Sequence, residues 1–109
     1  MTTASVPLDT ERLRAQADRI AGALKLLTHP DRMLLLCKLS QREMCVGELE
    51  QELDFHQPSL SQQLGVLRTE GVVSTRREGK NVYYRLADPA LMEILAALYR
   101  TYCLKPQGN

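Results

Sequence analysis

The sequence predicts one small, mainly helical domain that carries a single β-hairpin. Three observations lead to this prediction. The chain has 109 residues, enough for one domain. Apolar residues recur at three- and four-residue steps over most of its length, as in amphipathic helices. Only residues 72–86 are rich instead in β-branched and aromatic residues. We expect the domain to span residues 9–104, with flexible segments at residues 1–8 and 105–109.

Helices are expected over most of the first 70 residues. Asp9 or Thr10 can cap a first helix that ends near residue 28, because a short side-chain oxygen accepts from the free N–H groups of the first turn. Pro30 fits the first turn of a second helix, expected over residues 31–39. A short acidic helix is expected over residues 45–53. After a turn at 54–56, a further helix over 57–70 is ended by Gly71, which tolerates positive φ.

The residue pattern in the second half of the chain predicts a hairpin and a last helix. Residues 72–77 and 81–86 form the two strands, joined by a turn at 78–80. Asp88 and Pro89 can start the last helix, which we expect to end near Cys103. The first and last helices carry more apolar surface than one small core needs, so we expect them to join two copies into a homodimer. The residues expected in this interface are Leu13, Ile20, Leu24, Leu91, Ile94, Leu95, Leu98 and Tyr102.

Composition excludes several classes of protein. With 14 basic and 13 acidic residues the net charge is +1, which argues against a protein that coats nucleic acid through charge alone. No apolar run approaches the roughly 18–20 residues of a membrane span, and the first residues lack the apolar core of a signal peptide. We therefore expect a cytoplasmic protein with no membrane partner, in a compartment that keeps cysteines reduced.

Two short helices, a turn and a helix rich in Ser and Gln form the pattern of a helix-turn-helix. Gln can pair with adenine in the major groove, and Ser can contact bases or phosphates. The basic hairpin tip that follows is typical of a wing that reaches phosphates or the minor groove. Residues 57–86 hold five basic and two acidic residues, whereas residues 41–56 hold one basic and five acidic. The positive charge is thus confined to the expected DNA-binding segment.

These features predict a winged helix-turn-helix that binds double-stranded DNA. A homodimer would read an inverted repeat, with its two recognition helices about 34–36 Å apart. The residues expected at the DNA are Gln57, Ser59, Ser61, Gln62, Gln63, Arg68, Arg76, Arg77, Lys80 and Asn81.

From about residue 13 to residue 103 the chain resembles the ArsR family of winged-helix repressors. The matching stretches are LTHPDR at 27–32, CVGEL at 45–49, QPSLSQQLGVLR at 57–68 and TRREGKNVYY at 75–84. The resemblance implies a homodimeric repressor that leaves its operator when an effector binds. Many relatives sense metal ions. Here the Cys-x-Cys pair of one such site reads Cys45-Val46-Gly47, and the last helix has no His, so no metal or other cofactor is expected.

Cys45 and Cys103 resemble the cysteine pair of the BigR/SqrR-type branch, whose members sense reactive sulfur species. The resemblance implies that persulfide links Cys45 to Cys103 through a disulfide or polysulfide and thereby releases the DNA of sulfide- or persulfide-handling genes. Cys45 at a helix N-terminus favours the reactive thiolate, and Cys103 near the chain end is accessible. Cys37, in an apolar helix, is expected to be an inert packing residue.

Three alternatives to this hypothesis stay open. The first is an ArsR-type repressor that responds to a general oxidant or to a metal ion. The second is a small thiol enzyme, which the sequence disfavours because it has no Cys-x-x-Cys motif and no cofactor loop. The third is a winged helix that binds proteins rather than DNA, which a steep dependence of duplex binding on salt would exclude.

Overall fold

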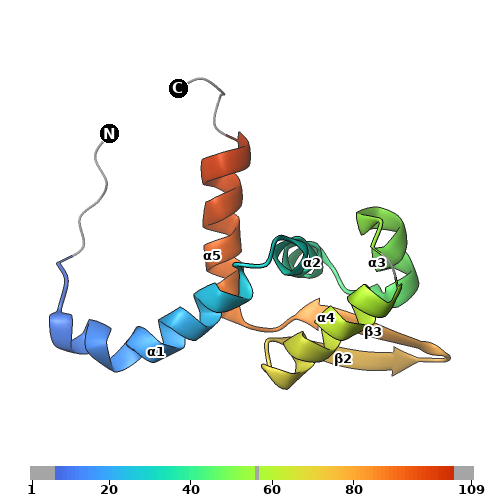
Figure 1. Ribbon diagram of the computed structural model, residues 1–109, viewed down its shortest axis with the longest axis horizontal. Coiled ribbons are helices and arrows are strands. Elements are labelled where there is room, and N and C mark those ends of the chain that lie inside the picture. Colours follow the sequence, from blue (N-terminus) through green and yellow to red (C-terminus); the bar gives the residue numbers. More distant parts are fainter. Residues whose placement is uncertain (1–6, 56, 105–109) are drawn as a thin grey trace.

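The structure, a computed structural model, describes residues 7–55 and 57–104, and within them it has five α-helices, a three-stranded sheet and a closing π-helix (Figure 1). The predicted mainly helical fold with a β-hairpin wing is confirmed. Most of the predicted flexible ends, residues 1–6 and 105–109, lies outside the described residues. The elements are α1 (Thr10–Leu26), α2 (Pro30–Gln41), β1 (Met44–Cys45), α3 (Val46–Leu53), α4 (Gln57–Thr69), β2 (Val73–Glu78), β3 (Asn81–Leu86), α5 (Pro89–Tyr99) and η1 (Arg100–Leu104).

Local chemistry explains where several elements begin and end. The Asp9 carboxylate accepts from the backbone N–H groups of residues 11 and 12 and caps α1. Asp88 caps α5 in the same way, with its carboxylate 2.9 Å from the nitrogen of Ala90. Gly71 after α4 and Gly79 in the hairpin turn have φ values of +75° and +62°. A residue with a Cβ is strained in that region, so both turns favour glycine.

The sheet contains one strand that the sequence did not predict. β2 and β3 form the expected antiparallel hairpin, with Val73 opposite Leu86 and Glu78 opposite Asn81. β1 pairs with the other edge of β3, so the strand order is β1-β3-β2 and Cys45 lies opposite Tyr83. A strand of two residues has no periodicity to detect, and it forms here because β3 offers an unpaired edge to residues 44–45.

The core lies between α2, α3, α4, α5 and the sheet. Its fully buried members are apolar, and α1 contributes only its last residue to them. They are Leu26, Leu35, Leu36, Leu39, Met44, Leu49, Leu60, Leu64, Leu67, Val72, Val73, Leu86, Leu91 and Leu95. Leu91 and Leu95 are 0% and 3% exposed within a single chain. Their predicted place in a dimer interface is therefore corrected, because the core of the same chain already covers them.

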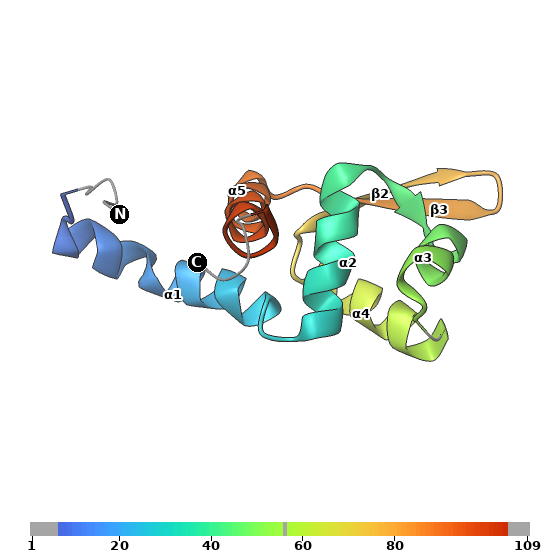
Figure 2. The ribbon, with the colours of Figure 1, turned by 90° about the horizontal axis from the view of Figure 1, so that it is seen from above.

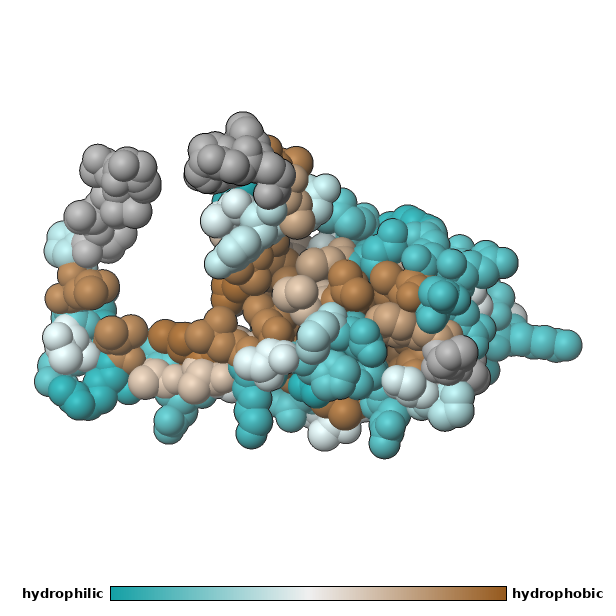
Figure 3. Space-filling view, turned by 45° about the horizontal axis from the view of Figure 1, so that its top comes forward, coloured by the Kyte–Doolittle hydropathy of each residue, from teal (hydrophilic) through white to brown (hydrophobic). Residues whose placement is uncertain are grey.

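Helix α1 extends away from the rest of the molecule as an arm, and α5 stands beside α2 in both ribbon views (Figures 1 and 2). Apolar surface runs along α1 and up the neighbouring side of α5 (Figure 3). Its large exposed side chains are Leu13, Ile20, Leu24, Tyr99, Tyr102 and Leu104. The half-buried Ile94 and Leu98 lie on α5 between this surface and the core.

The end of the last helix differs from the prediction. The α-helix stops at Tyr99, and residues 100–104, which include Cys103, continue as a π-helix. Residues 100–104 are all exposed. No helix among the described residues is long and apolar enough to cross a membrane.

Candidate functional site

Helices α3 and α4 form the predicted helix-turn-helix, and Asp54 ends α3 in the left-handed conformation with φ +58°. Helix α4 buries Leu60, Leu64 and Leu67 at three- and four-residue spacing. The intervening positions face outward, where Ser59, Ser61 and Gln62 are exposed at the start of the helix. The residues nearest the N-terminus of a recognition helix are those that reach bases. Gln57 begins α4, and the position of its side chain lies outside the described part of the chain.

Gln63 differs from its neighbours on α4 because its side chain has partners within the chain. The Arg32 Nε atom donates to the side-chain oxygen of Gln63 at 3.1 Å. The amide nitrogen of Gln63 lies 3.4 Å from Nε2 of His29, the residue that precedes α2. The half-buried Gln63 side chain therefore joins the recognition helix to the start of α2. Periodicity alone did not reveal this, because a residue at the edge of the apolar stripe can turn either way.

The predicted wing is present, and part of its charge is free to meet a phosphate backbone. Arg77, Lys80 and Asn81 are exposed at the far end of the β2–β3 hairpin. Arg68 is exposed in the last turn of α4. Arg68 thus lies at the end of α4, and Arg77 and Lys80 lie on the wing.

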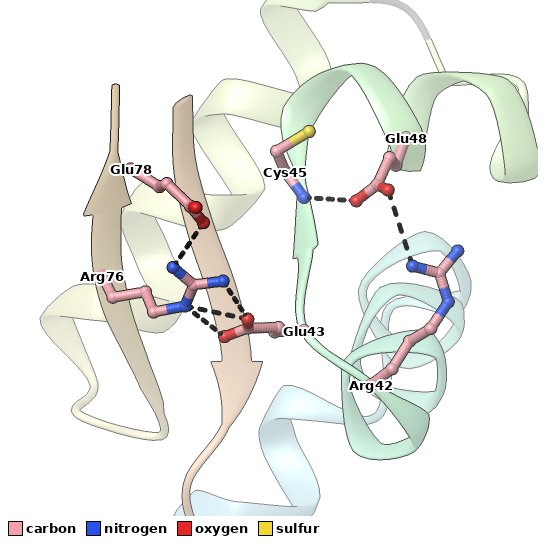
Figure 4. Close-up of polar contacts among 6 residues, drawn as sticks. All are labelled: Arg42, Glu43, Cys45, Glu48, Arg76 and Glu78. Atoms are coloured by element: carbon pink, nitrogen blue, oxygen red, sulfur yellow. Dashed lines mark hydrogen bonds and ion pairs between the residues drawn. The ribbon is translucent and has the colours of Figure 1, made fainter. Parts of the chain in front are cut away.

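Arg76 is also on the wing, but carboxylates surround its guanidinium (Figure 4). Its Nε lies 2.8 and 3.0 Å from the two carboxylate oxygens of Glu43, and its Nη2 donates to the same group. Its Nη1 donates to Glu78 at 2.8 Å. The guanidinium carbon also sits 4.8 Å from the ring centre of Tyr83. The Arg76 donors thus have anionic partners within the chain, and its contact with DNA stays a prediction.

These contacts also shift the pKa values of the groups that make them. The hydrogen bonds from Arg76 lower the pKa of the Glu43 carboxyl. The hydrogen bonds to Glu43 and then to Glu78 raise the pKa of Arg76. Each partner favours the charged form of the other.

A second set of charges joins the end of α2 to α3. Lys38 Nζ and Arg42 Nη2 each lie 2.6 Å from an oxygen of Glu52, and the hydrogen bond from Lys38 is the main cause that lowers the pKa of Glu52. Arg42 also lies 3.6 Å from Glu48. The other oxygen of Glu48 accepts from the backbone N–H of Cys45 at 3.0 Å (Figure 4). Part of the acidic charge of α3 is therefore compensated within the chain.

The three cysteines differ in their surroundings, and Cys103 interacts electrostatically with Cys37. Cys45 is half-buried at the N-cap of α3 and opposite Tyr83 in the sheet. Cys103 is exposed on η1. Burial raises the pKa of the Cys37 thiol, and charge on the neighbouring Cys103 raises it further. Cys103 is thus within electrostatic reach of Cys37.

Cys37 was expected to be only a packing residue. It does pack against the core, but it also lines a groove of about 760 Å³ between α2 and α5, with Tyr99 and Arg100 on the opposite wall. Sequence reasoning missed this role because a cysteine in an apolar helix gives no sign of which element covers it. Among residues 7–55 and 57–104, no group of three His, Cys, Asp or Glu is arranged to hold a metal ion.

A helix-turn-helix followed by a basic hairpin defines the class of winged helix-turn-helix proteins. The profile of the family described as bacterial regulatory protein, arsR family, matches residues 29–75. Together with the relatives below, this match shows that the chain belongs to the arsR family of bacterial regulatory proteins.

Three relatives describe the place of the chain in this family. It is 50% identical over 97 residues to the biofilm growth-associated repressor of Agrobacterium fabrum, covering 89% of this chain and 82% of that protein. It is 33% identical to the transcriptional activator HlyU of Vibrio cholerae, covering 89% of this chain and 90% of HlyU. The crystal structure of the transcriptional repressor BigR from Xylella fastidiosa matches with a TM-score of 0.85 and 44% identity, covering 90% of this chain and 100% of that one.

Proposed function

We propose that this protein is a transcriptional repressor that lays α4 in the major groove of an operator and rests its wing on the flanking phosphates. The observation that carries the proposal is the exposed surface of α4 formed by Ser59, Ser61 and Gln62, together with exposed Arg68, Arg77 and Lys80. Gln supplies base-edge recognition, and Arg and Lys supply phosphate contacts. The repressor names of the A. fabrum and X. fastidiosa relatives support repression rather than activation.

The proposal includes a homodimer that pairs α1 and the end of α5 with the same elements of a second copy. It is supported by the exposed apolar side chains of Leu13, Ile20, Leu24 and Tyr102, to which Tyr99 is added. A lone α1 arm leaves these groups in water, whereas a partner would cover them. Two-fold symmetry would then set two recognition helices about 34–36 Å apart on an inverted repeat.

The effector in this proposal is a reactive sulfur species that acts on Cys37 and Cys103. This pair is supported over Cys45 and Cys103 by two observations: Cys37 lines the groove whose other wall is Tyr99 and Arg100, shortly before Cys103, and Cys103 interacts electrostatically with Cys37. The exposed Cys103 thiolate attacks the outer sulfur of a persulfide RSSH, RSH leaves, and Cys103 becomes a persulfide. Cys37 then attacks the inner sulfur of this persulfide, Sγ of Cys103, and expels the outer sulfur as hydrogen sulfide, which leaves a disulfide. In balance, RSSH and two thiols give RSH, hydrogen sulfide and one disulfide, so the sulfane sulfur is reduced and the two thiols are oxidised.

Such a bridge would alter DNA binding because it ties α2, which packs beside the helix-turn-helix, to the end of the helix proposed for dimerisation. It would favour a dimer geometry whose recognition helices no longer match the half-sites. A coupling free energy of about 1–3 kcal/mol between the two sites changes affinity about 5- to 150-fold.

The test uses duplexes selected by the protein from random-sequence DNA, with affinity measured before and after addition of polysulfide. Three single variants, Cys37→Ser, Cys45→Ser and Cys103→Ser, serve as matched controls. We expect all three to bind DNA when reduced, and only Cys45→Ser to release it like the natural protein. Mass analysis should show a Cys37–Cys103 bridge. Loss of release in Cys45→Ser alone would overturn this pair, and equal bridging by peroxide would make the protein a general oxidant sensor.

A further inference from the structure

Val73 and Leu86 anchor the base of the wing in the core, and beyond them the wing is held by a short sheet and by a cluster of side chains. Its inner strand β3 pairs with only two residues of β1, at Met44–Tyr84 and Cys45–Tyr83. Glu43 comes directly before β1, and Arg76 is on β2, the strand at the other edge of the sheet. The Glu43–Arg76 contact therefore crosses over β3, with the ring of Tyr83 beneath the guanidinium. We call Glu43, Arg76, Glu78 and Tyr83 the wing strap.

We propose that Arg76 is a positioning residue, which fixes the wing relative to α4 so that Arg77 and Lys80 meet the DNA backbone. This inference rests on the proposed DNA-binding function. A basic residue on a wing is ordinarily assigned to phosphate, but here Arg76 contacts two carboxylates of its own chain, Glu43 before β1 and Glu78 at the end of β2.

The chemistry of the wing strap suits arginine in particular. The Nε and Nη2 atoms form a planar fork that matches the two oxygens of Glu43, and Nη1 is left to reach Glu78. The flat guanidinium also stacks on Tyr83. Lysine has one ammonium and cannot make the forked contact and the stack at once.

The next residue on the strand provides a matched control. Side chains alternate between the two faces of a strand, so Arg77 points away from Arg76. It is exposed and lies opposite Val82 in the hairpin. Arg76 and Arg77 thus have the same charge and adjacent positions in the hairpin, but we assign the first to the fold of the wing and the second to the DNA backbone.

The experiment measures duplex affinity against salt concentration for Glu43→Gln, Arg76→Gln, the double variant, Arg76→Lys and Arg77→Gln. We expect Glu43→Gln and Arg76→Gln each to weaken duplex binding about two- to fivefold per protomer, because an exposed ion pair changes an equilibrium constant by about that factor. The slope of log affinity against log salt should be unchanged in both variants. The double variant should bind no more weakly than either single variant, because both remove one contact. Arg76→Lys should weaken duplex binding to the same extent as Arg76→Gln. Arg77→Gln should flatten the slope of log affinity against log salt by about 0.9 per protomer, since one phosphate contact is lost.

The opposite pattern would overturn the inference. If Arg76 served phosphate and Glu43 merely masked it, Glu43→Gln would tighten DNA binding and steepen the salt slope, and Arg76→Gln would flatten it. A double variant with additive losses would also contradict a shared contact.

A second measurement needs no DNA and separates this inference from the proposed function. Backbone hydrogen exchange of residues 76–83 in the free protein should be faster in Glu43→Gln and Arg76→Gln and unchanged in Arg77→Gln, because only the first two loosen the wing. If hydrogen exchange in all variants equalled that of the natural protein, the inference that the wing strap fixes the wing would be overturned. If the natural protein bound no duplex, the proposed DNA-binding function would be wrong. The hydrogen-exchange rates would still decide whether Arg76 positions the wing.

Discussion

Replacing Leu24 or Leu95 with Ala should affect two different equilibria, because the structure places the two leucines in different surroundings. Leu95 is 3% exposed in the core, and a buried Leu→Ala change costs about 2–5 kcal/mol of unfolding free energy. Leu24 is 48% exposed on α1, so about half of its burial free energy, roughly 0.7–1.5 kcal/mol, is still available to a partner. In the proposed symmetric dimer the change would occur twice, so Leu24→Ala should raise the dimer dissociation constant roughly 10- to 150-fold.

The assay combines sedimentation, which gives the dissociation constant, with urea unfolding at two protein concentrations. For Leu24→Ala we expect weaker association and nearly natural stability of the separated protomer. For Leu95→Ala we expect a lower unfolding midpoint at both concentrations. The assignment would be refuted if Leu24→Ala left association unchanged, or if Leu95→Ala split the dimer while the protomer kept its stability. Unfolding of a dimer depends on protein concentration, so both concentrations are needed.

Three further predictions concern base reading, the thiols and a helix end. Gln62→Ala should relax base preference, at a cost of about 1–3 kcal/mol for a lost bidentate contact. Selection from random duplexes checks this, and an unchanged preference would contradict the assigned face of α4. Because burial and Cys103 raise the pKa of Cys37, its proton is retained to higher pH and its alkylation rate should reach half-maximum above the ordinary value of 9.0. Mass analysis across pH measures that midpoint, and Cys103→Ser should lower it. A midpoint at or below 9.0 would refute the raised pKa of Cys37. Asp88→Ala removes the cap of α5 and should lower the unfolding free energy by about 0.5–2 kcal/mol in thermal or urea unfolding; an unchanged value would show that the cap is dispensable.

Ion pairs connect the helix that carries Cys37 of the proposed switch to the helix-turn-helix proposed to bind DNA. Cys37 is followed on α2 by Lys38, which pairs with Glu52 of α3. Arg42, just after α2, pairs with Glu48 and Glu52. A change at Cys37 would therefore occur on the helix whose end is held by charge to the first helix of the helix-turn-helix. These exposed pairs orient α2 and α3 rather than stabilise the fold strongly.

Much of the fold could be predicted because its signals are local. The 3.6-residue period of α4, the Asp caps of α1 and α5, and the glycines after α4 and in the hairpin turn each depend on a few consecutive residues. The same holds for Ser59 and Gln62, whose outward position follows from the apolar stripe on the other side of α4. Their order along the chain was enough to predict a winged helix-turn-helix.

The sequence by itself determined the order of elements, the basic wing and the resemblance to one regulator family, all from short-range patterns. Only the tertiary structure decided that Cys103 neighbours Cys37, that Arg76 and Gln63 bind other parts of the chain, and that Leu91 and Leu95 face the core. Each of these outcomes depends on which surfaces meet across long separations in the chain. A thiol, a guanidinium or a leucine carries no local signal of its distant partner, because that partner is chosen by the packing of whole helices and strands.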